Sequence, residues 1–376
     1  MLGRITSVMV KEFIELWRDK WGRFRLIVPP LLQLVLFGYA ATFEVYHVST
    51  AVLDLDHTQE SRELIARFAD SGRFDIVETA RTPADIRAAI DRSDAVVAIV
   101  IQAGFAEQLR KGASAPAQII VDGTNSNTAL IALGYVSQIV SAYAQETAQD
   151  LSRRLHPAQP PPPTVTLEQR PWYNPDYNSR WFFVPGVIAT LTLVMVVNLT
   201  SFAIVREREV GTLEQVMVTP ISRVEFILGK TVPFFVIAVT QMILIMLIGI
   251  LWFQVPFRGN YLVFGIGTAV FLLSVLGAAL LLSTVAETQQ QAMIVAFFFI
   301  SPAITLSGFS FPISSMPVAL QWLTLLDPLR FYLVIIRDSF LKGSDWRTLA
   351  PQICALMVLT TALLTISVQR FHKSLD

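Results

Sequence analysis

Long apolar runs without any Asp, Glu, Lys or Arg alternate with charged segments along this chain. The uncharged runs cover residues 26–43, 181–205, 231–257, 259–286, 288–326 and 348–369. A helix that crosses the hydrocarbon core of a membrane needs about 20 mostly apolar residues, because each residue adds about 1.5 Å to its length. Each run is long enough for one crossing. Buried helices of a large soluble core are the alternative, but a soluble fold rarely needs six such runs.

The uncharged runs predict six transmembrane helices. We place them at 26–43, 181–205, 229–253, 261–285, 290–309 and 349–369, the last five within a membrane region that covers 181–370. The fifth run is too long for one crossing and contains several prolines and a glycine after residue 301. It therefore predicts one span followed by a re-entrant segment at 313–340 on the outer side.

The N-terminal segment 1–25 shows a different pattern. Apolar residues such as Ile5, Met9 and Phe13 recur at helical spacing, and basic residues take other positions. A basic amphipathic helix of this kind lies in the plane of a membrane interface. A helix that packs on another protein chain would show the same pattern.

Residues 44–180 alternate short apolar runs with polar helical patterns, and they predict a small α/β domain inserted after the first span. The strand candidates are 51–55, 74–78, 95–101 and 117–121, and the helix candidates are 59–69, 83–91, 105–110 and 127–155. A proline-rich linker follows at 156–163. The fold class is therefore an α-helical polytopic membrane protein with six transmembrane helices and an inserted small periplasmic α/β domain.

Composition supports this class and excludes others. Hydrophobic residues make up 53% of the 376 residues and charged residues only 15%, with 29 basic and 29 acidic side chains. A neutral chain is not a broadly basic nucleic-acid binder. The single cysteine, Cys354, excludes a disulfide framework and a cysteine metal cluster within one chain.

Lys and Arg near the span ends predict the orientation, because cytoplasmic loops carry an excess of these residues. Basic residues gather in 1–25, in the loop 206–228 and at the C-terminal end next to the tail 371–376. We therefore expect both termini and this loop in the cytoplasm and the 44–180 domain outside. A cleaved signal peptide is disfavoured, because both the leading segment and the first apolar run are long for a signal.

The loop 206–228 contains two helix-capping signals. Thr212 with Gln215 and Ser222 with Glu225 are capping boxes, and Pro220 ends the first helix before the second begins. The pattern predicts a short rigid helix over 213–218 that presents apolar side chains to the cytoplasm. Such a helix is suited to receive force from another protein, although an ordinary interface helix between spans would look similar.

Some short patterns resemble sites for other chemistry. Gly229-Lys230-Thr231 resembles the end of a phosphate-binding loop, but it enters a membrane span and lacks the preceding glycine. Asp54 and Asp56 are interpreted as solvated or capping residues, because no other hydrolytic group accompanies them. The sequence thus predicts neither an enzyme site, nor a metal site, nor a cofactor bound by this chain.

Polar residues in or near spans are candidates for a transport pathway, since they are costly against lipid. Gln33 and Asn198 are the two candidates within the spans. Asp327 and Arg330 begin a polar cluster at the outer corner, with two further charges at Arg337 and Asp338. Charges at this level can pair, line a polar cavity or lie in solvent.

The loop motif reads Glu207-Arg208-Glu209-x-Gly211-Thr212-Leu213-Glu214 and ends in Thr219-Pro220. It resembles the permease subunits of type-2 ABC exporters, in the bacterial multidrug-export-like branch with a large periplasmic domain. The resemblance covers essentially the whole chain, with Asp327 standing where that family more often has Asn. It implies that the short helix couples the permease to an ATPase. The coupling residues that it implies are Glu207, Glu209, Gly211, Thr212, Leu213, Glu214, Met217, Thr219 and Pro220.

The resemblance implies partners as well. These are a second permease chain, identical or paralogous, and ATP-binding subunits that would hold ATP and Mg²⁺, with an adaptor protein in the periplasm for some members. It implies export of small hydrophobic compounds across the bacterial inner membrane. Two alternatives from the residues themselves are a membrane-anchored periplasmic binding or scaffold protein and an ion-coupled carrier.

Overall fold

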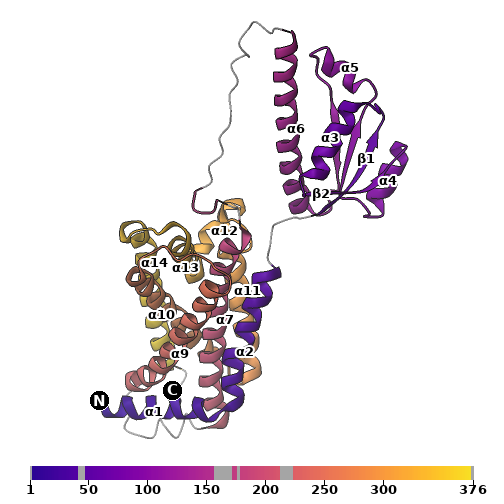
Figure 1. Ribbon diagram of the computed structural model, residues 1–376. Helices are drawn as coiled ribbons and strands as arrows, with labels where there is room; N and C mark the ends of the chain where they lie inside the picture. Colours follow the sequence, from indigo (N-terminus) through magenta and orange to yellow (C-terminus); the bar gives the residue numbers. More distant parts are fainter. Residues whose placement is uncertain (1, 41–46, 156–171, 176–177, 212–222, 374–376) are drawn as a thin grey trace. The chain divides into compact units, whose positions relative to one another are not determined.

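The computed structural model describes residues 2–40, 47–155, 172–175, 178–211 and 223–373 (Figure 1). The chain forms two compact units. The first, here called the membrane body, comprises Met1–Thr42 and Pro171–Asp376, and the second, the sheet unit, comprises Phe43–Arg170. Each unit is described by itself.

The described part of the membrane body is built from helices. Its α-helices are α1 (Leu2–Arg18), α2 (Lys20–Ala40), α7 (Ser179–Val210), α9 (Arg223–Leu251), α10 (Tyr261–Val285), α11 (Gln289–Leu306), α12 (Val318–Leu323), α13 (Pro328–Arg337) and α14 (Trp346–Lys373). Short 3-10 turns lie at Ile313–Ser315 and Thr324–Leu326, and a π-helical turn lies at Asp338–Lys342. Six of these helices, α2, α7, α9, α10, α11 and α14, are long and apolar enough to cross a membrane.

Helix α7 extends past the expected end of its span. The sequence placed the start of a loop at 206, whereas the helix continues through the four charged residues 206–209 to Val210. It ends where Gly211 adopts a positive φ of 77°, the left-handed conformation that glycine reaches without a steric penalty. The structure next describes α9 from Arg223, so the expected short helix at 213–218 lies outside the described residues.

The six long helices differ in how much of their surface the membrane body covers. Within their most apolar windows, α7 is 67% buried and α10 is 61% buried, whereas α2 and α11 are only 18% and 17% buried. The first two helices therefore form the interior of the bundle. The last two expose their apolar faces to whatever surrounds this unit, lipid or another chain.

The chain bends sharply after α12. The segments Val318–Leu326 and Pro328–Lys342 meet at an angle of 84°. Pro328 has no N–H to donate and suits the first turn of a helix, and the Asp327 side chain accepts a hydrogen bond from the Leu329 N–H at 2.9 Å. The pair of helices thus has the geometry of a broken span or of the expected re-entrant segment.

The sheet unit contains one four-stranded sheet in the order β2-β1-β3-β4. Strand β1 pairs in parallel with β2 and β3, and β4 runs antiparallel to β3. The elements are β1 (Val48–Asp54), α3 (Gln59–Asp70), β2 (Phe74–Thr79), α4 (Pro83–Asp91), β3 (Val97–Ile101), α5 (Phe105–Arg110), β4 (Ala117–Val121) and α6 (Ser126–Leu155). The expected βα alternation is present.

Two apolar layers enclose the sheet because successive strand residues point to opposite faces. On β1, Val48 and Val52 pack with residues of α3 and α6. Ala51 and Leu53 pack on the other face with residues of α4. Helices therefore cover both faces, as a sheet with parallel strands requires.

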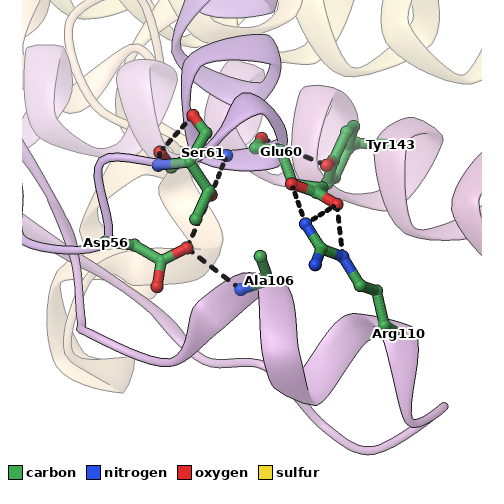
Figure 2. Close-up of polar contacts among 7 residues, drawn as sticks. Asp56, Glu60, Ser61, Ala106, Arg110 and Tyr143 are labelled. Atoms are coloured by element: carbon green, nitrogen blue, oxygen red, sulfur yellow. Dashed lines mark hydrogen bonds and ion pairs between the residues drawn. The ribbon is translucent and has the colours of Figure 1, made fainter.

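Asp54 and Asp56 act as capping residues at the end of β1. Asp54 accepts hydrogen bonds from the Ser61 hydroxyl at 2.7 Å and from the backbone N–H groups of Asp56 and His57. Asp56 accepts from the backbone N–H groups of Gly104 and Ala106, at the start of α5. Figure 2 shows the contact with Ala106. The carboxylates thus join the first turns of two helices to the strand.

An Asp56→Ala substitution is expected to loosen α5. The change removes two backbone caps, and the loss of one helix cap costs about 0.5–2 kcal/mol. Amide hydrogen exchange of Ala106 should therefore accelerate by about tenfold. Glu107→Ala, which affects only an exposed pair with Lys111, serves as the control.

The same contact predicts a pH dependence. The hydrogen bond from the Thr58 hydroxyl, together with the α5 N–H groups, lowers the pKa of Asp56. A carboxyl whose pKa is lower in the folded than in the unfolded state stabilises the fold. This stabilisation is fully present above the unfolded pKa of about 3.9 and is lost as the pH falls through the folded pKa. Unchanged exchange in Asp56→Ala would contradict the capping role.

Candidate functional site

The ends of α7 and α9 that flank residues 212–222 meet helix α1, and we call this region the loop end. Helix α1 runs crosswise to the bundle in Figure 1 and packs against α9. The chain turns from α1 into α2 at Asp19, whose side chain accepts a hydrogen bond from the Gly22 N–H at 2.9 Å. This cap fixes the corner between the two helices.

A cluster of four charged side chains lies at the loop end, and three of them are buried. Lys230 Nζ of α9 lies 2.6 Å from Glu207 Oε2 of α7 and 3.3 Å from Glu12 Oε1 of α1. Lys11 Nζ, also on α1, donates to Glu207 Oε1 at 2.7 Å. Lys230 is only 2% exposed, and both glutamates are 8% exposed. Two cations and two anions therefore neutralise each other where three helices meet.

Burial of charge makes this cluster sensitive to the loss of any member. An ion removed from water is costly unless a partner of opposite charge stays in contact with it. Burial raises the pKa of Glu12. Burial opposes protonation of Lys11, but the hydrogen bond from Lys11 to Glu207 and the charge of that carboxylate outweigh it and raise the pKa of Lys11.

A glycine lets the helices approach closely enough to form the cluster. A Cβ atom at Gly229 would lie 2.8 Å from Cβ and Cγ1 of Val8, closer than real side chains come. The absence of a side chain at this position brings α1 against α9. The next residue, Lys230, then reaches Glu12 across the contact.

Glu209 connects the end of α7 to the junction between α10 and α11. Its Oε2 accepts hydrogen bonds from the Gln289 side-chain amide at 2.8 Å and backbone N–H at 3.3 Å. The neighbouring Arg208 donates to the Ala286 carbonyl at 3.1 Å. The charged end of α7 is therefore fastened on two sides, to α1 and α9 and to the α10–α11 junction.

The structure describes three of the nine expected coupling residues. Glu207 and Glu209 lie in the contacts above, and Gly211 ends α7. The other six lie outside the described residues, and they are Thr212, Leu213, Glu214, Met217, Thr219 and Pro220.

Sequence reasoning missed the acidic member of the cluster on α1. Glu12 stands seven residues after Ile5 and three after Met9, so it shares the apolar face of the helix. An acidic residue on that face was the available signal for a buried partner. Lys11 was interpreted only as a charge of the polar face, and Lys230 only as part of a motif.

Acidic oxygens at the loop end do not amount to a separate cation site. Carboxylate oxygens of Glu12, Glu15 and Glu207 all lie within 4.8 Å of one another. Lys230 and Lys11 already occupy this space with their ammonium groups. Lys230 also lies inside α9 rather than in a glycine-rich loop.

The pathway candidates occupy different surfaces of the bundle. Gln33 is exposed on α2, and Asn198 is half-buried on α7. The described residues therefore leave the Gln33 side chain open to the surroundings of this unit.

The residues of the expected outer corner find separate partners. Asp327 caps α13, whereas Arg330 donates to the Gln321 carbonyl at 3.2 Å and to the Thr324 hydroxyl. Arg330 also lines a pocket of about 390 Å³ together with the charged residues Arg337, Asp338 and Lys342. Asp338 pairs with Lys342 at 2.7 Å while lining this pocket, and Asp327 does not line it.

Comparison with known proteins decides the family. The family model described as "ABC-2 family transporter protein" matches residues 20–368, nearly the whole chain. The chain belongs to the ABC-2 transporter family. The resemblance drawn from the loop motif is thereby confirmed. An ABC-2 chain is the membrane-spanning permease of an ATP-driven transporter and works with an ATP-binding subunit.

Relatives of similar length support this assignment. The chain is 37% identical to the "Probable multidrug ABC transporter permease YbhR" of Escherichia coli K12, over 99% of both chains. It is 31% identical to YbhS, which carries the same description, over 99% of this chain and 98% of that relative. It is 27% identical to the "Inner membrane transport permease YhhJ" over 100% and 98%.

Proposed function

We propose that this ABC-2 permease exports small hydrophobic compounds or drugs outward across a bacterial inner membrane. The substrate class is supported by the multidrug and inner-membrane descriptions of its relatives. ATP hydrolysis belongs to a separate subunit that binds ATP and Mg²⁺, and this chain contributes the path through the membrane.

The buried charge cluster is the observation that carries the mechanism. Residues 212–220 would dock on the ATPase as the coupling element, and Lys230, Glu207 and Glu12 join the two helices that flank it to α1. A displacement of the coupling element would therefore move α7, α9 and α1 together. Because α7 is the most buried of the six long helices, its shift would be passed to the rest of the bundle.

A second permease chain would complete the path. Helices α2 and α11 are the least buried of the six candidate spans, and α2 exposes the polar Gln33 within an otherwise apolar surface. A side-chain amide is costly against lipid and is better satisfied against protein. We place α2, α7 and α11 at the substrate path between two chains, with Gln33 and Asn198 as its polar lining.

The topology follows from the distribution of Lys and Arg. Both termini and the coupling element would face the cytoplasm, with α1 in the membrane interface. The sheet unit would lie in the periplasm, connected through the linker 156–163. Its place there would allow contact with an adaptor protein.

The coupling assignment predicts that Glu214→Ala and Glu209→Ala impair both export and the ATP hydrolysis that substrate stimulates. With the partner ATPase present, export of a hydrophobic dye should fall by about tenfold, the factor that about 1.4 kcal/mol of lost docking free energy gives. Substrate-stimulated ATPase activity should fall in parallel, and the amount of assembled complex should not.

Glu107→Ala is the matched control, because it removes an exposed glutamate of the sheet unit. Full export by properly folded Glu214→Ala and Glu209→Ala variants would show that residues 212–220 are not the coupling element.

A further inference from the structure

The corner pocket, defined by Arg330, Arg337, Asp338 and Lys342, carries an excess of positive charge. Three cationic side chains face one carboxylate around a volume of about 390 Å³. A volume of this size lies in the range of small-molecule sites, about 300–1,000 Å³. The proposed export mechanism does not use the pocket, which lies away from the loop end.

Arg337 lacks an acceptor for most of its donors. Its Nη1 lies 3.5 Å from the Gly308 carbonyl, at the limit of a hydrogen bond, and its guanidinium stacks 4.0 Å from the centre of the Phe182 ring. Nε and Nη2 are buried and have no hydrogen-bond partner among the described residues. A guanidinium with unsatisfied buried donors is costly unless an acceptor enters the site.

The carboxylate of the pocket is already engaged. Asp338 lies 2.7 Å from Lys342 Nζ and accepts a hydrogen bond from the Ser344 hydroxyl at 3.3 Å. Arg330 donates only to neutral oxygens in its described contacts, those of Gln321 and Thr324. Within the described residues, two arginines of the pocket therefore have no carboxylate as a hydrogen-bonding partner.

The pocket sits at the ends of two candidate spans. Ser307 and Gly308 directly follow α11, and Gln352 lies in the second turn of α14. The ends of spans lie near the polar headgroups of a bilayer. Arginine forms bidentate hydrogen bonds with phosphate oxygens, and basic pockets between membrane helices bind lipid headgroups.

We propose that the corner pocket binds a phosphate group, with Arg337 as its principal ligand and Arg330 as a second. The phosphate belongs either to the headgroup of a phospholipid or to a soluble phosphate compound. Both sources offer the anionic oxygens that Arg337 lacks. Ser307 and Gln352 border the same space.

The test is binding to the full-length permease in detergent, followed by native mass spectrometry and calorimetry. The probes are phosphatidylglycerol, a diacylglycerol with the same acyl chains, and inorganic phosphate. Binding of phosphatidylglycerol but not of diacylglycerol supports a lipid headgroup. Binding of inorganic phosphate without phosphatidylglycerol supports a soluble phosphate. If neither phosphatidylglycerol nor inorganic phosphate binds, the proposal is overturned. The unsubstituted protein alone is enough for this outcome.

Variants identify the site. Arg337→Gln should weaken binding by about tenfold, because it removes charge-assisted hydrogen bonds. Asp338→Asn should strengthen binding by about threefold or more, because it removes a nearby negative charge and frees Lys342. Arg180→Gln is the control, since Arg180 contacts the Tyr39 ring and lies outside the pocket. Equal losses in Arg337→Gln and Arg180→Gln, or weaker binding in Asp338→Asn, would overturn the assignment.

Discussion

A Lys230→Met substitution is expected to destabilise the membrane body by about 3–5 kcal/mol, the usual effect of removing one partner from a buried ion pair. Lys230 is 2% exposed, and its ammonium contacts carboxylates from two other helices. Without it, Glu12 and Glu207 would face each other in a site that water scarcely reaches. Repulsion between them would separate α1 from α7 and α9.

The measurement is thermal unfolding of the purified chain, followed by the fluorescence of its seven tryptophans. Lys20→Met is the matched control, because Lys20 is exposed at the start of α2 in the same unit. The double variant Lys230→Met/Glu207→Leu should recover much of the loss, since it also removes one of the stranded carboxylates. If the unfolding temperature falls no further in Lys230→Met than in Lys20→Met, the charge cluster contributes little to the stability of the membrane body.

The membrane helices could be predicted from the sequence because lipid imposes one simple requirement. Every residue that faces hydrocarbon must be apolar, so a crossing appears as an uninterrupted run. Helix ends were harder to place. Charges at 206–209 suggested the end of a helix, whereas the structure satisfies them through contacts of Glu207 and Glu209 with other elements.

The buried cluster could not be predicted because its partners are far apart in the sequence. Glu207 and Lys11 are separated by 196 positions, and no local pattern joins them. Glu12 carried a local signal, a charge on an apolar helix face, but that signal does not name its partner. Asp54 was easier to interpret, since it accepts hydrogen bonds from backbone N–H groups two and three residues away. Asp56 instead caps α5 across 48 and 50 positions.

The outer corner also combines a local feature that the sequence predicts with an arrangement that it does not predict. The sequence placed Asp327 and Arg330 at the same corner, and Asp327-Pro328 is a local helix-start signal that the structure uses. Whether charges pair or line a cavity depends on which helices surround them. That arrangement is fixed by the packing of α11, α13 and α14 and is invisible in any one segment.

A Gly229→Ala substitution is expected to impair transport by about tenfold or more while leaving every charge in place. The added methyl carbon would lie 2.8 Å from Cβ and Cγ1 of Val8. These atoms are close to the backbone of α1, so a change of rotamer cannot remove the contact. Overpacking of this kind costs about 1–3 kcal/mol, and α1 must move away from α9 to relieve it.

Movement of α1 would draw Glu12 away from Lys230 and loosen the support of the coupling element. Export of a hydrophobic dye and substrate-stimulated ATPase activity of the complex measure the effect. Gly265→Ala is the matched control, because Gly265 lies in α10 with open space around it. This change should stabilise the helix by about 0.5–1 kcal/mol. The compensating variant Gly229→Ala/Val8→Gly removes the clashing atoms and should restore activity. If it fails to do so, or if Gly229→Ala behaves like Gly265→Ala, close contact between α1 and α9 is not required for coupling.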